Sequence, residues 1–282
     1  MSTEHMRVST MACAAVIMLG ACGVGGGNAE DGVKPYKYPA RHVVACQDSR
    51  RARSLSEPQL PSGPVRYRVK APANYDPSFA HPLLVVFSAA GADAGRTERY
   101  THLTPAATEQ GFVVAYVDHH TMSKNGILAL GRVVRDVEGQ WCIDRGRVFM
   151  AGHSDGGTAA TALALLPETR ADVHGIAVSA AGFRTEDLEQ LGCRDPIPVM
   201  VMHGVNDKLF PGWGEQAAKW WASCNGCGQQ SGFKDPARPE CRAYERCPSR
   251  APVLYCELPT AHNNWPGLHS RMVGFLLGPE PH

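Results

Sequence analysis

Residues 147–160 read RVFMAGHSDGGTAA, a segment that predicts a strand, a sharp turn and a helix in succession. Residues 147–151 are a short apolar run typical of a strand, and the alanine-rich segment after residue 157 is typical of a helix. Ser154 lies between them, with a glycine two positions before it and another two positions after it. A strand, a sharp turn and a helix in this order expose a serine hydroxyl as a nucleophile. We therefore predict a catalytic role for Ser154, and not merely a structural turn.

A serine hydroxyl needs a base that removes its proton and an acid that orients the base. After a turn of this kind the partners follow in the order serine, acid, histidine. Asp207 follows the apolar run 197–202 and is the predicted acid, and His262 follows the apolar run 252–257 and is the predicted base. The other candidates precede a strand, lie in helical or loop segments, or end the chain: Asp172, Asp187, Asp195, His269 and His282.

Negative charge that develops on a substrate carbonyl oxygen is usually stabilised by two backbone amides. One belongs to the residue after the nucleophile, here Asp155. The other comes from the loop after an early strand. Residues 83–87 have the composition of that strand, and small residues follow them, so we predict the Ala90 amide as the second oxyanion donor. His153 and His203, at strand ends beside the predicted site, are expected to pack and orient.

From Val65 onward, apolar runs alternate with segments of helical spacing, which predicts an α/β fold with a mostly parallel sheet covered by helices on both faces. The runs are rich in valine and do not alternate with polar residues, as expected for strands buried on both faces. The predicted strands are 65–70, 83–88, 112–117, 147–151, 174–179, 197–202 and 252–257. The predicted helices are 97–110, 127–139, 154–166, 214–223 and 268–277.

The N-terminal region has the pattern of an export signal. Arg7 precedes the apolar run 11–19, which is too short to span a bilayer and predicts a signal peptide over residues 1–21. The sequence LGAC at 19–22 resembles a bacterial lipobox, which predicts a lipid on Cys22; an ordinary signal peptide is the alternative. Residues 22–62 are predicted to form a tether and irregular segment, and residues 63–282 the catalytic domain. The expected location is periplasmic, cell-surface or extracellular.

Eight cysteines follow Cys22, namely Cys46, Cys142, Cys193, Cys224, Cys227, Cys241, Cys247 and Cys256. An even number in an exported chain favours disulfides, although eight cysteines allow 105 pairings and the sequence does not select one. The alternative is a zinc site formed by the cysteines at 224, 227, 241 and 247. Residues 224–250 lack periodicity and are predicted to form a disulfide-stapled excursion near the site.

The charge balance excludes some partners. The 28 Lys and Arg of this 282-residue chain nearly cancel the 27 Asp and Glu, which leaves no field that attracts nucleic acid or an anionic membrane. A lipid at Cys22 is the one membrane attachment that we predict. The expected partner is a neutral or apolar ester, which a polymer would also supply. A serine mechanism needs no cofactor and no metal, so none is predicted, and the oligomeric state stays open.

Four further segments carry a resemblance to a known family: CIDRGRV at 142–148, HGVNDK at 203–208, WASCNGC at 221–227 and HNNWPG at 262–267. With these segments the chain resembles the extracellular poly(3-hydroxybutyrate) depolymerases and the feruloyl and acetylxylan esterases of the α/β-hydrolases, from about Val65 to Leu277. The resemblance implies the same three residues, Ser154, Asp207 and His262, and a metal-independent hydrolysis through an acyl-enzyme. Its implied substrates are polyesters or the feruloyl and acetyl esters of plant polysaccharide.

The chain departs from the family pattern at two places. Members usually carry His-Gly where this chain has Ser88 and Ala89, and many carry alanine where it has Asp155, whose carboxylate is expected to repel anionic substrates. Trp213 and Trp265 follow the predicted acid and base and are candidates for a substrate-binding cleft, with ordinary packing as the alternative. The altered loop also keeps a second function open, that of a non-catalytic surface lipoprotein that binds a ligand in the cleft.

Overall fold

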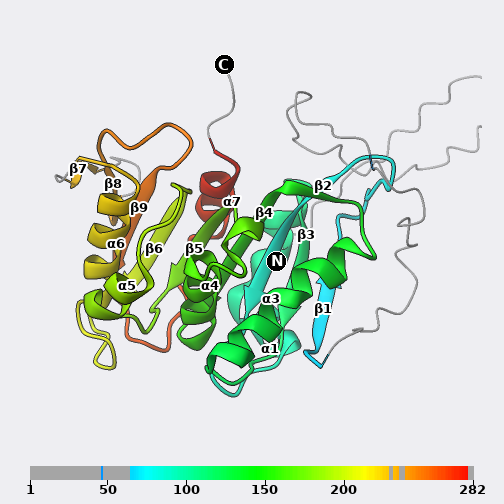
Figure 1. The fold of residues 1–282 in the computed structure, drawn as a ribbon, viewed down its shortest axis with the longest axis horizontal. Coiled ribbons are helices and arrows are strands. Elements are labelled where there is room, and N and C mark those ends of the chain that lie inside the picture. The colour runs from blue at the N-terminus through cyan, green and yellow to red at the C-terminus, as the bar shows by residue number, and fades with distance from the viewer. Residues whose placement is uncertain (1–45, 47–63, 229–230, 235–238, 279–282) are drawn as a thin grey trace, which may run out of the picture. The chain divides into compact units, whose positions relative to one another are not determined.

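The computed structural model describes residues 46, 64–228, 231–234 and 239–278, and in this part of the chain the strands form a nine-stranded sheet. The order across the sheet is β1-β3-β2-β4-β5-β6-β9-β8-β7, drawn in Figure 1. The strands are β1 (Tyr67–Lys70), β2 (His81–Phe87), β3 (Val113–Val117), β4 (Ile143–His153), β5 (Gly175–Ser179), β6 (Val199–Gly204), β7 (Ser231–Lys234), β8 (Cys241–Tyr244) and β9 (Val253–Leu258). Six neighbouring strands are parallel to one another, namely β3, β2, β4, β5, β6 and β9. Strand β1 is antiparallel at one edge, and the antiparallel strands β8 and β7 form the other.

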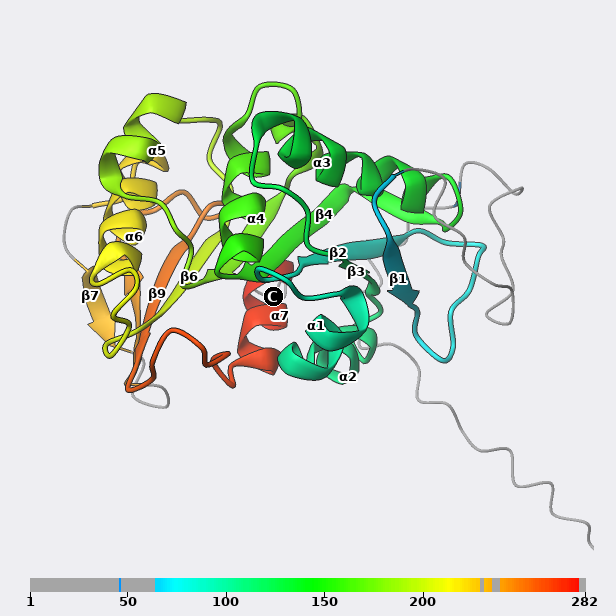
Figure 2. The ribbon, with the colours of Figure 1, turned by 90° about the horizontal axis from the view of Figure 1, so that it is seen from below.

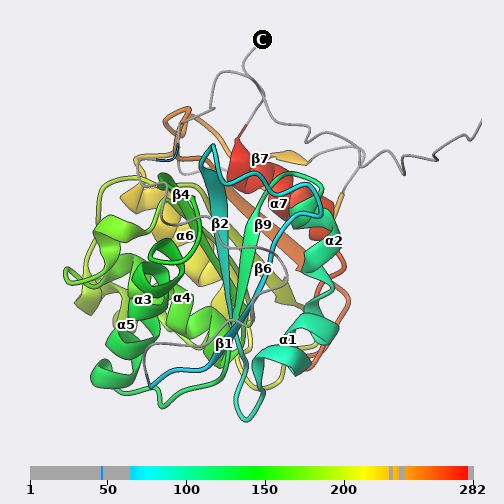
Figure 3. The ribbon, with the colours of Figure 1, turned by 90° about the vertical axis from the view of Figure 1, so that its right-hand side faces the viewer.

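Helices cover both faces of this sheet. They are α1 (Ala94–Thr101), α2 (Leu103–Thr108), α3 (Lys124–Glu138), α4 (Asp155–Leu165), α5 (Thr185–Leu191), α6 (Trp213–Cys224) and α7 (His269–Leu277), with a short 3₁₀ turn at Arg170–Asp172. Side chains of α3, α4, α5 and α6 pack in one apolar core, and those of α1, α2 and α7 pack in the other. Figures 2 and 3 show these two groups on opposite sides of the sheet. The predicted α/β architecture is therefore confirmed.

The central strands are buried on both faces, as their unbroken apolar runs predict. Every residue of β2, β3, β5 and β6 is buried. Because parallel strands all end at the same edge of a sheet, the segments that follow β2, β4, β6 and β9 meet there. Those segments hold all of the residues predicted for catalysis.

Two helical regions differ from expectation. The single helix predicted over 97–110 is two helices, α1 and α2, separated by His102, whose backbone φ of 49° is left-handed and ends α1. Such a φ is sterically costly for a residue with a side chain, so the sequence gives no composition signal for it. The helix α5 was not predicted; the Asp187 side chain accepts the Arg184 amide at its N-terminus.

The excursion after α6 is more regular than its composition suggests. Strands β7 and β8 form a hairpin that extends the sheet beside β9, and the pairing of Cys241 with Cys256 lies in the β8–β9 ladder. An edge hairpin of four-residue strands is too short to show a period-2 pattern clearly.

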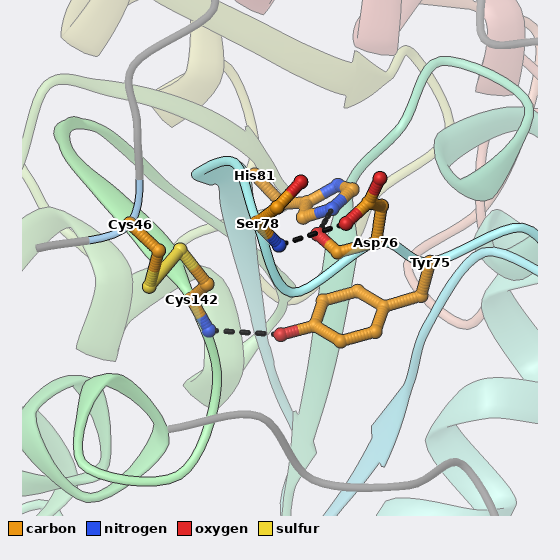
Figure 4. The surroundings of a disulfide bond; sticks show 6 residues. All are labelled: Cys46, Tyr75, Asp76, Ser78, His81 and Cys142. Atoms are coloured by element: carbon orange, nitrogen blue, oxygen red, sulfur yellow. Dashed lines mark hydrogen bonds between the residues drawn. A yellow bond between two sulfur atoms is a disulfide. The ribbon is translucent and has the colours of Figure 1, made fainter. Parts of the chain in front are cut away.

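The described cysteines are joined in four disulfides: Cys46–Cys142, Cys193–Cys224, Cys227–Cys247 and Cys241–Cys256. The four cysteines of the zinc alternative are therefore divided among three bridges, and no thiolate is left for a metal, so that alternative was wrong. The bridge of Cys46 to Cys142 is shown in Figure 4, where the Cys142 amide donates to the Tyr75 hydroxyl at 2.9 Å. It closes the longest loop of the four and restricts the unfolded chain most.

The predicted signal peptide, the lipidation site at Cys22 and nearly all of the tether over 22–62 lie outside the described residues. Among the residues that are described, no helix has the length and apolarity needed to cross a membrane.

Candidate active site

Ser154 lies at the tip of the turn between β4 and α4. Its φ of 55° and ψ of −119° fall in a region that residues with side chains seldom adopt. The Ser154 amide donates to the Ser179 carbonyl at 2.9 Å, which fixes this turn to the end of β5. A strained backbone that the surrounding structure holds in place is typical of catalytic positions.

The two glycines around Ser154 are needed for close approach of backbones. A Cβ at Gly152 would collide with the backbone of Gly156, and a Cβ at Gly156 would collide with the Phe87 carbonyl. The left-handed φ belongs to the serine itself, and not to either glycine. This packing also brings the first turn of α4 against the end of β2, so the loop after β2 lies beside Ser154.

The structure brings the three predicted catalytic residues into one hydrogen-bonded chain. His262 Nε2 lies 2.9 Å from Ser154 Oγ, and His262 Nδ1 lies 2.8 Å from Asp207 Oδ2. Asp207 Oδ1 accepts the amides of Leu209 and Phe210, each at 2.9 Å. The residues come from three loops, after β4, β6 and β9, and this arrangement allows a proton to pass from the hydroxyl to the imidazole.

Asp207 is held in its ionised form although it is buried. Burial alone would raise the pKa of this carboxyl, but the hydrogen bond from the Phe210 amide and the interaction with His262 outweigh it, so the pKa lies below its ordinary value. An ionised Asp207 accepts the Nδ1 proton of His262, which leaves Nε2 free to accept the proton of Ser154.

Two buried histidines flank this chain of hydrogen bonds. His153 Nδ1 lies 3.1 Å from Ser179 Oγ, and burial, together with the nearby His262, lowers the pKa of His153 to about 4. His203 Nε2 lies 3.8 Å from Asp207 Oδ2, and burial lowers the pKa of His203 as well. Both rings are neutral at pH 7, so neither competes with His262 for the charge of Asp207. Both rings pack beside the hydrogen-bonded chain, His153 against His262 and His203 near Asp207.

We predict that the protein loses stability in mild acid. Burial lowers the pKa of several histidines, namely His81, His153, His174, His203 and His269. Their stabilising effect is complete above the unfolded histidine pKa of about 6.5 and declines as pH falls towards the folded pKa. For His153 alone the loss of unfolding free energy between pH 7.5 and pH 5.0 is about 2 kcal/mol.

Urea titrations at these two pH values measure the loss. In His153→Gln the pH-dependent part should shrink by about 2 kcal/mol, because glutamine does not titrate. Equal unfolding free energies of the unaltered protein at both pH values would contradict this assignment of buried neutral histidines.

The predicted oxyanion donors lie on either side of the close contact between β2 and α4. Among the described residues, the amides of Asp155 and Ala90 donate to no backbone or side-chain acceptor. The loop that carries Ala90 is fixed at its start, where Ser88 donates both its amide and its hydroxyl to the Val117 carbonyl. Ser88 thus anchors the start of this loop to β3. The two free amides are available for a substrate oxygen.

A cavity of about 540 Å³ opens in front of Ser154 and His262. Its lining consists of Phe87, Ala89, Ala90, Ala92, Arg96, Thr97, Tyr100, Thr101, His153, Ser154, Leu209, His262 and Asn263. Sequence reasoning missed the contribution of α1, whose lining residues from Arg96 to Thr101 recur at helical spacing directly after the oxyanion loop. That spacing is the signal that points to them. Residues 224–250 were predicted to lie near the site, but none of their described residues lines this cavity.

The two predicted substrate-binding tryptophans do not line this cavity. Trp213 stacks on Phe210, with 4.7 Å between ring centroids, and so supports the loop that carries Asp207. Trp265 packs edge-on against Tyr100 and His153. Both rings therefore pack against neighbouring aromatic side chains in the structure. In the described part of the chain, no group of three or more histidine, cysteine or acidic side chains is arranged to hold a metal.

The fold and the arrangement at the β4–α4 turn are those of the α/β-hydrolases. No protein-family model matches the chain. Feruloyl esterase C from Emericella nidulans is 27% identical over 185 residues, an alignment that covers 61% of this chain and 65% of that protein. The chain thus matches just under two thirds of the length of this relative.

Solved structures share the fold at low sequence identity. The acetyl xylan esterase from Aspergillus awamori is 12% identical, with a TM-score of 0.53 over 71% of this chain and 89% of that one. A thermophilic esterase from Thermogutta terrifontis is 13% identical, with a TM-score of 0.51 over 74% of this chain and 84% of that one.

Proposed function

We propose that this protein is a serine hydrolase of carboxylic esters. The observation that carries the proposal is the hydrogen-bonded chain from Ser154 Oγ through His262 to Asp207, at 2.9 and 2.8 Å. A buried carboxylate, a neutral imidazole and a serine on a strained turn, all facing one cavity, form the apparatus of acyl transfer. The relationship to feruloyl esterase C supports the same reaction.

Hydrolysis proceeds through an acyl-enzyme in two steps. His262 Nε2 takes the Ser154 proton as Oγ forms a bond to the ester carbonyl carbon, and Asp207 stabilises the imidazolium. The amides of Asp155 and Ala90 donate to the carbonyl oxygen as it becomes negative. The C–O bond to the alcohol breaks, and His262 gives the proton to that oxygen. A water molecule then attacks the acyl carbon, with His262 again as base. The bond between this carbon and Ser154 Oγ breaks, His262 returns the proton to Oγ, and the carboxylic acid is released.

The proposed substrate is an ester with an aromatic acyl group, as in a feruloyl ester of plant polysaccharide. Tyr100, Phe87 and Leu209 give the cavity apolar walls, and its volume of about 540 Å³ lies in the range of small-ligand sites. The feruloyl esterase relative supports this choice over an acetyl ester or a polyester. The disulfides are consistent with work outside the cytoplasm, after export by the predicted signal peptide.

The alternative of a non-catalytic binding protein is not favoured. A binding cleft has no need of a serine in a strained conformation, hydrogen-bonded to an imidazole that a buried carboxylate orients. The altered loop that suggested this alternative is anchored through Ser88 and leaves the Ala90 amide free.

A fluorophosphonate probe tests for an activated serine. We expect one probe per molecule, attached to Ser154, because only a serine with a general base reacts at a useful rate. Ser154→Ala should abolish labelling, while Ser270→Ala, a change of an exposed serine on α7, should leave it unaltered. An unlabelled protein, or labelling that survives Ser154→Ala, would refute the proposed function.

A substrate panel tests the acyl group. We expect kcat/KM for methyl ferulate to exceed that for methyl acetate by about tenfold or more. The reason is that burial of the aromatic ring in an apolar cavity stabilises the transition state for methyl ferulate, and methyl acetate has no such ring. Acetylated xylan and a polyhydroxyalkanoate film complete the panel. Faster release of acetate than of ferulate would replace the feruloyl assignment with an acetyl ester. Clearing of the polyhydroxyalkanoate film alone would replace it with a polyester.

A further inference from the structure

His119 joins the two halves of the predicted oxyanion site. It follows β3 by two residues, and its amide donates to the Ala92 carbonyl at 3.0 Å, in the loop that carries Ala90. Its ring Nε2 lies 3.0 Å from Asp155 Oδ2, beside the nucleophile. Both side chains are partly buried, at 28% and 31% exposed.

The carboxylate of Asp155 is a liability at this position. Its own amide is one of the two oxyanion donors, so its negative charge lies on the residue nearest to the oxygen that becomes negative during the reaction. Like charges at short range raise the energy of the transition state, and they do so more strongly in a cavity than in water. An acidic residue is tolerated here only if its side chain is held away from the cavity.

The structure shows how the side chain is held away. Asp155 is absent from the cavity lining, whereas Ser154 beside it faces the cavity. The carboxylate is turned towards the His119 ring, a donor supplied by the loop after β3. This loop is itself fixed to the oxyanion loop, because Asp118 Oδ1 accepts the Ala94 amide at 2.8 Å and His119 donates to Ala92. These hydrogen bonds hold the segment that carries the imidazole in a fixed position beside the oxyanion loop.

We propose that His119 is a positioning residue for ester hydrolysis: its imidazole binds the Asp155 carboxylate and keeps this charge away from the oxyanion. The proposal rests on the proposed function. It also revises the expectation that Asp155 repels anionic substrates, because the carboxylate is directed away from the cavity and is hydrogen-bonded. Substrate still enters a cavity whose charged lining side chain is Arg96.

A double-mutant cycle tests this role, with p-nitrophenyl acetate as a neutral substrate. His119→Ala should lower kcat about tenfold and change KM less than about twofold, because the released carboxylate opposes charge that exists only in the transition state. In the Asp155→Asn background the same His119→Ala change should cost less than about twofold, because no charge is left to hold. His119→Gln keeps an N–H donor and should retain most of kcat.

The binding of a trifluoromethyl ketone provides a second readout, since its adduct with serine carries the oxyanion. Its Ki should rise with His119→Ala by the same factor as kcat falls. His120→Ala removes a neighbouring imidazole that is hydrogen-bonded to Thr121 and not to Asp155, and should alter neither quantity. Circular dichroism verifies that each variant is folded.

Three results would overturn the proposal: unchanged kcat in His119→Ala, an equal loss in both backgrounds, or a glutamine variant as impaired as the alanine variant. The last two would mean that the ring acts by packing. These outcomes differ from a failure of the proposed function, in which the unaltered protein and Ser154→Ala would hydrolyse the ester equally slowly.

Discussion

Ser154→Ala should lower kcat for p-nitrophenyl acetate by about 10⁵-fold or more, since loss of a catalytic serine removes the covalent route entirely. Alanine is close in size to serine and keeps the amide that donates to the Ser179 carbonyl. The left-handed φ remains costly with either residue, so stability should change little. Initial rates over a range of ester concentrations, together with a thermal melt, measure both effects.

The control for this experiment is Ser223→Ala, which alters an exposed serine on α6 that is not among the residues lining the cavity. Its rates should match those of the unaltered protein. Turnover of Ser154→Ala within tenfold of the unaltered protein would show that the serine is not the nucleophile.

Asp207→Asn should lower kcat by about 10³- to 10⁴-fold while the geometry survives. The asparagine Oδ1 still accepts the amides of Leu209 and Phe210, which forces its NH₂ group to face His262 Nδ1. His262 must then accept at Nδ1 and carry its proton on Nε2. In this tautomer it cannot take the proton of Ser154.

The matched change is Asp195→Asn, at an exposed aspartate before β6. It should leave kcat within about twofold, as surface substitutions usually do. If Asp207→Asn were equally harmless, the hydrogen bond to His262 would have no part in catalysis, and the role of the acid would be unassigned.

The three residues of the hydrogen-bonded chain were predictable because chain order and strand ends restrict the choice severely. Each candidate had to follow a buried strand of a parallel sheet, and only Asp207 and His262 did so after Ser154. Strand burial was predictable as well, since β2, β3, β5 and β6 are apolar without alternation. The structure then supplied the distances that the order implied.

Other features depend on contacts between distant parts of the chain, which composition does not reveal. The break at His102 reflects a left-handed backbone conformation that no glycine marks in the sequence. The disulfide partners are set by the arrangement of β8 beside β9 and of α6 beside the preceding loops, and spacing alone left 105 choices. The short hairpin of β7 and β8 gave no periodicity to detect.

At the site, the direction of the Asp155 side chain is also set by a contact with a distant part of the chain. Its position after the nucleophile was evident from the motif, but the direction of its carboxylate depends on His119, which lies 36 residues earlier. Trp213 and Trp265 were chosen for their proximity in sequence to the acid and the base, whereas the cavity is walled by α1. Sequence thus located the hydrogen-bonded chain well and the cavity lining poorly.

The most direct test of the account is to trap the acyl-enzyme. The protein is mixed with a p-nitrophenyl ester of a bulky acid and quenched in acid before deacylation, and its peptides are analysed by mass spectrometry. We predict a burst of one p-nitrophenol per molecule and an added acyl mass on the peptide that contains Ser154. Steady hydrolysis without an adduct, or an adduct on a different residue, would contradict the mechanism.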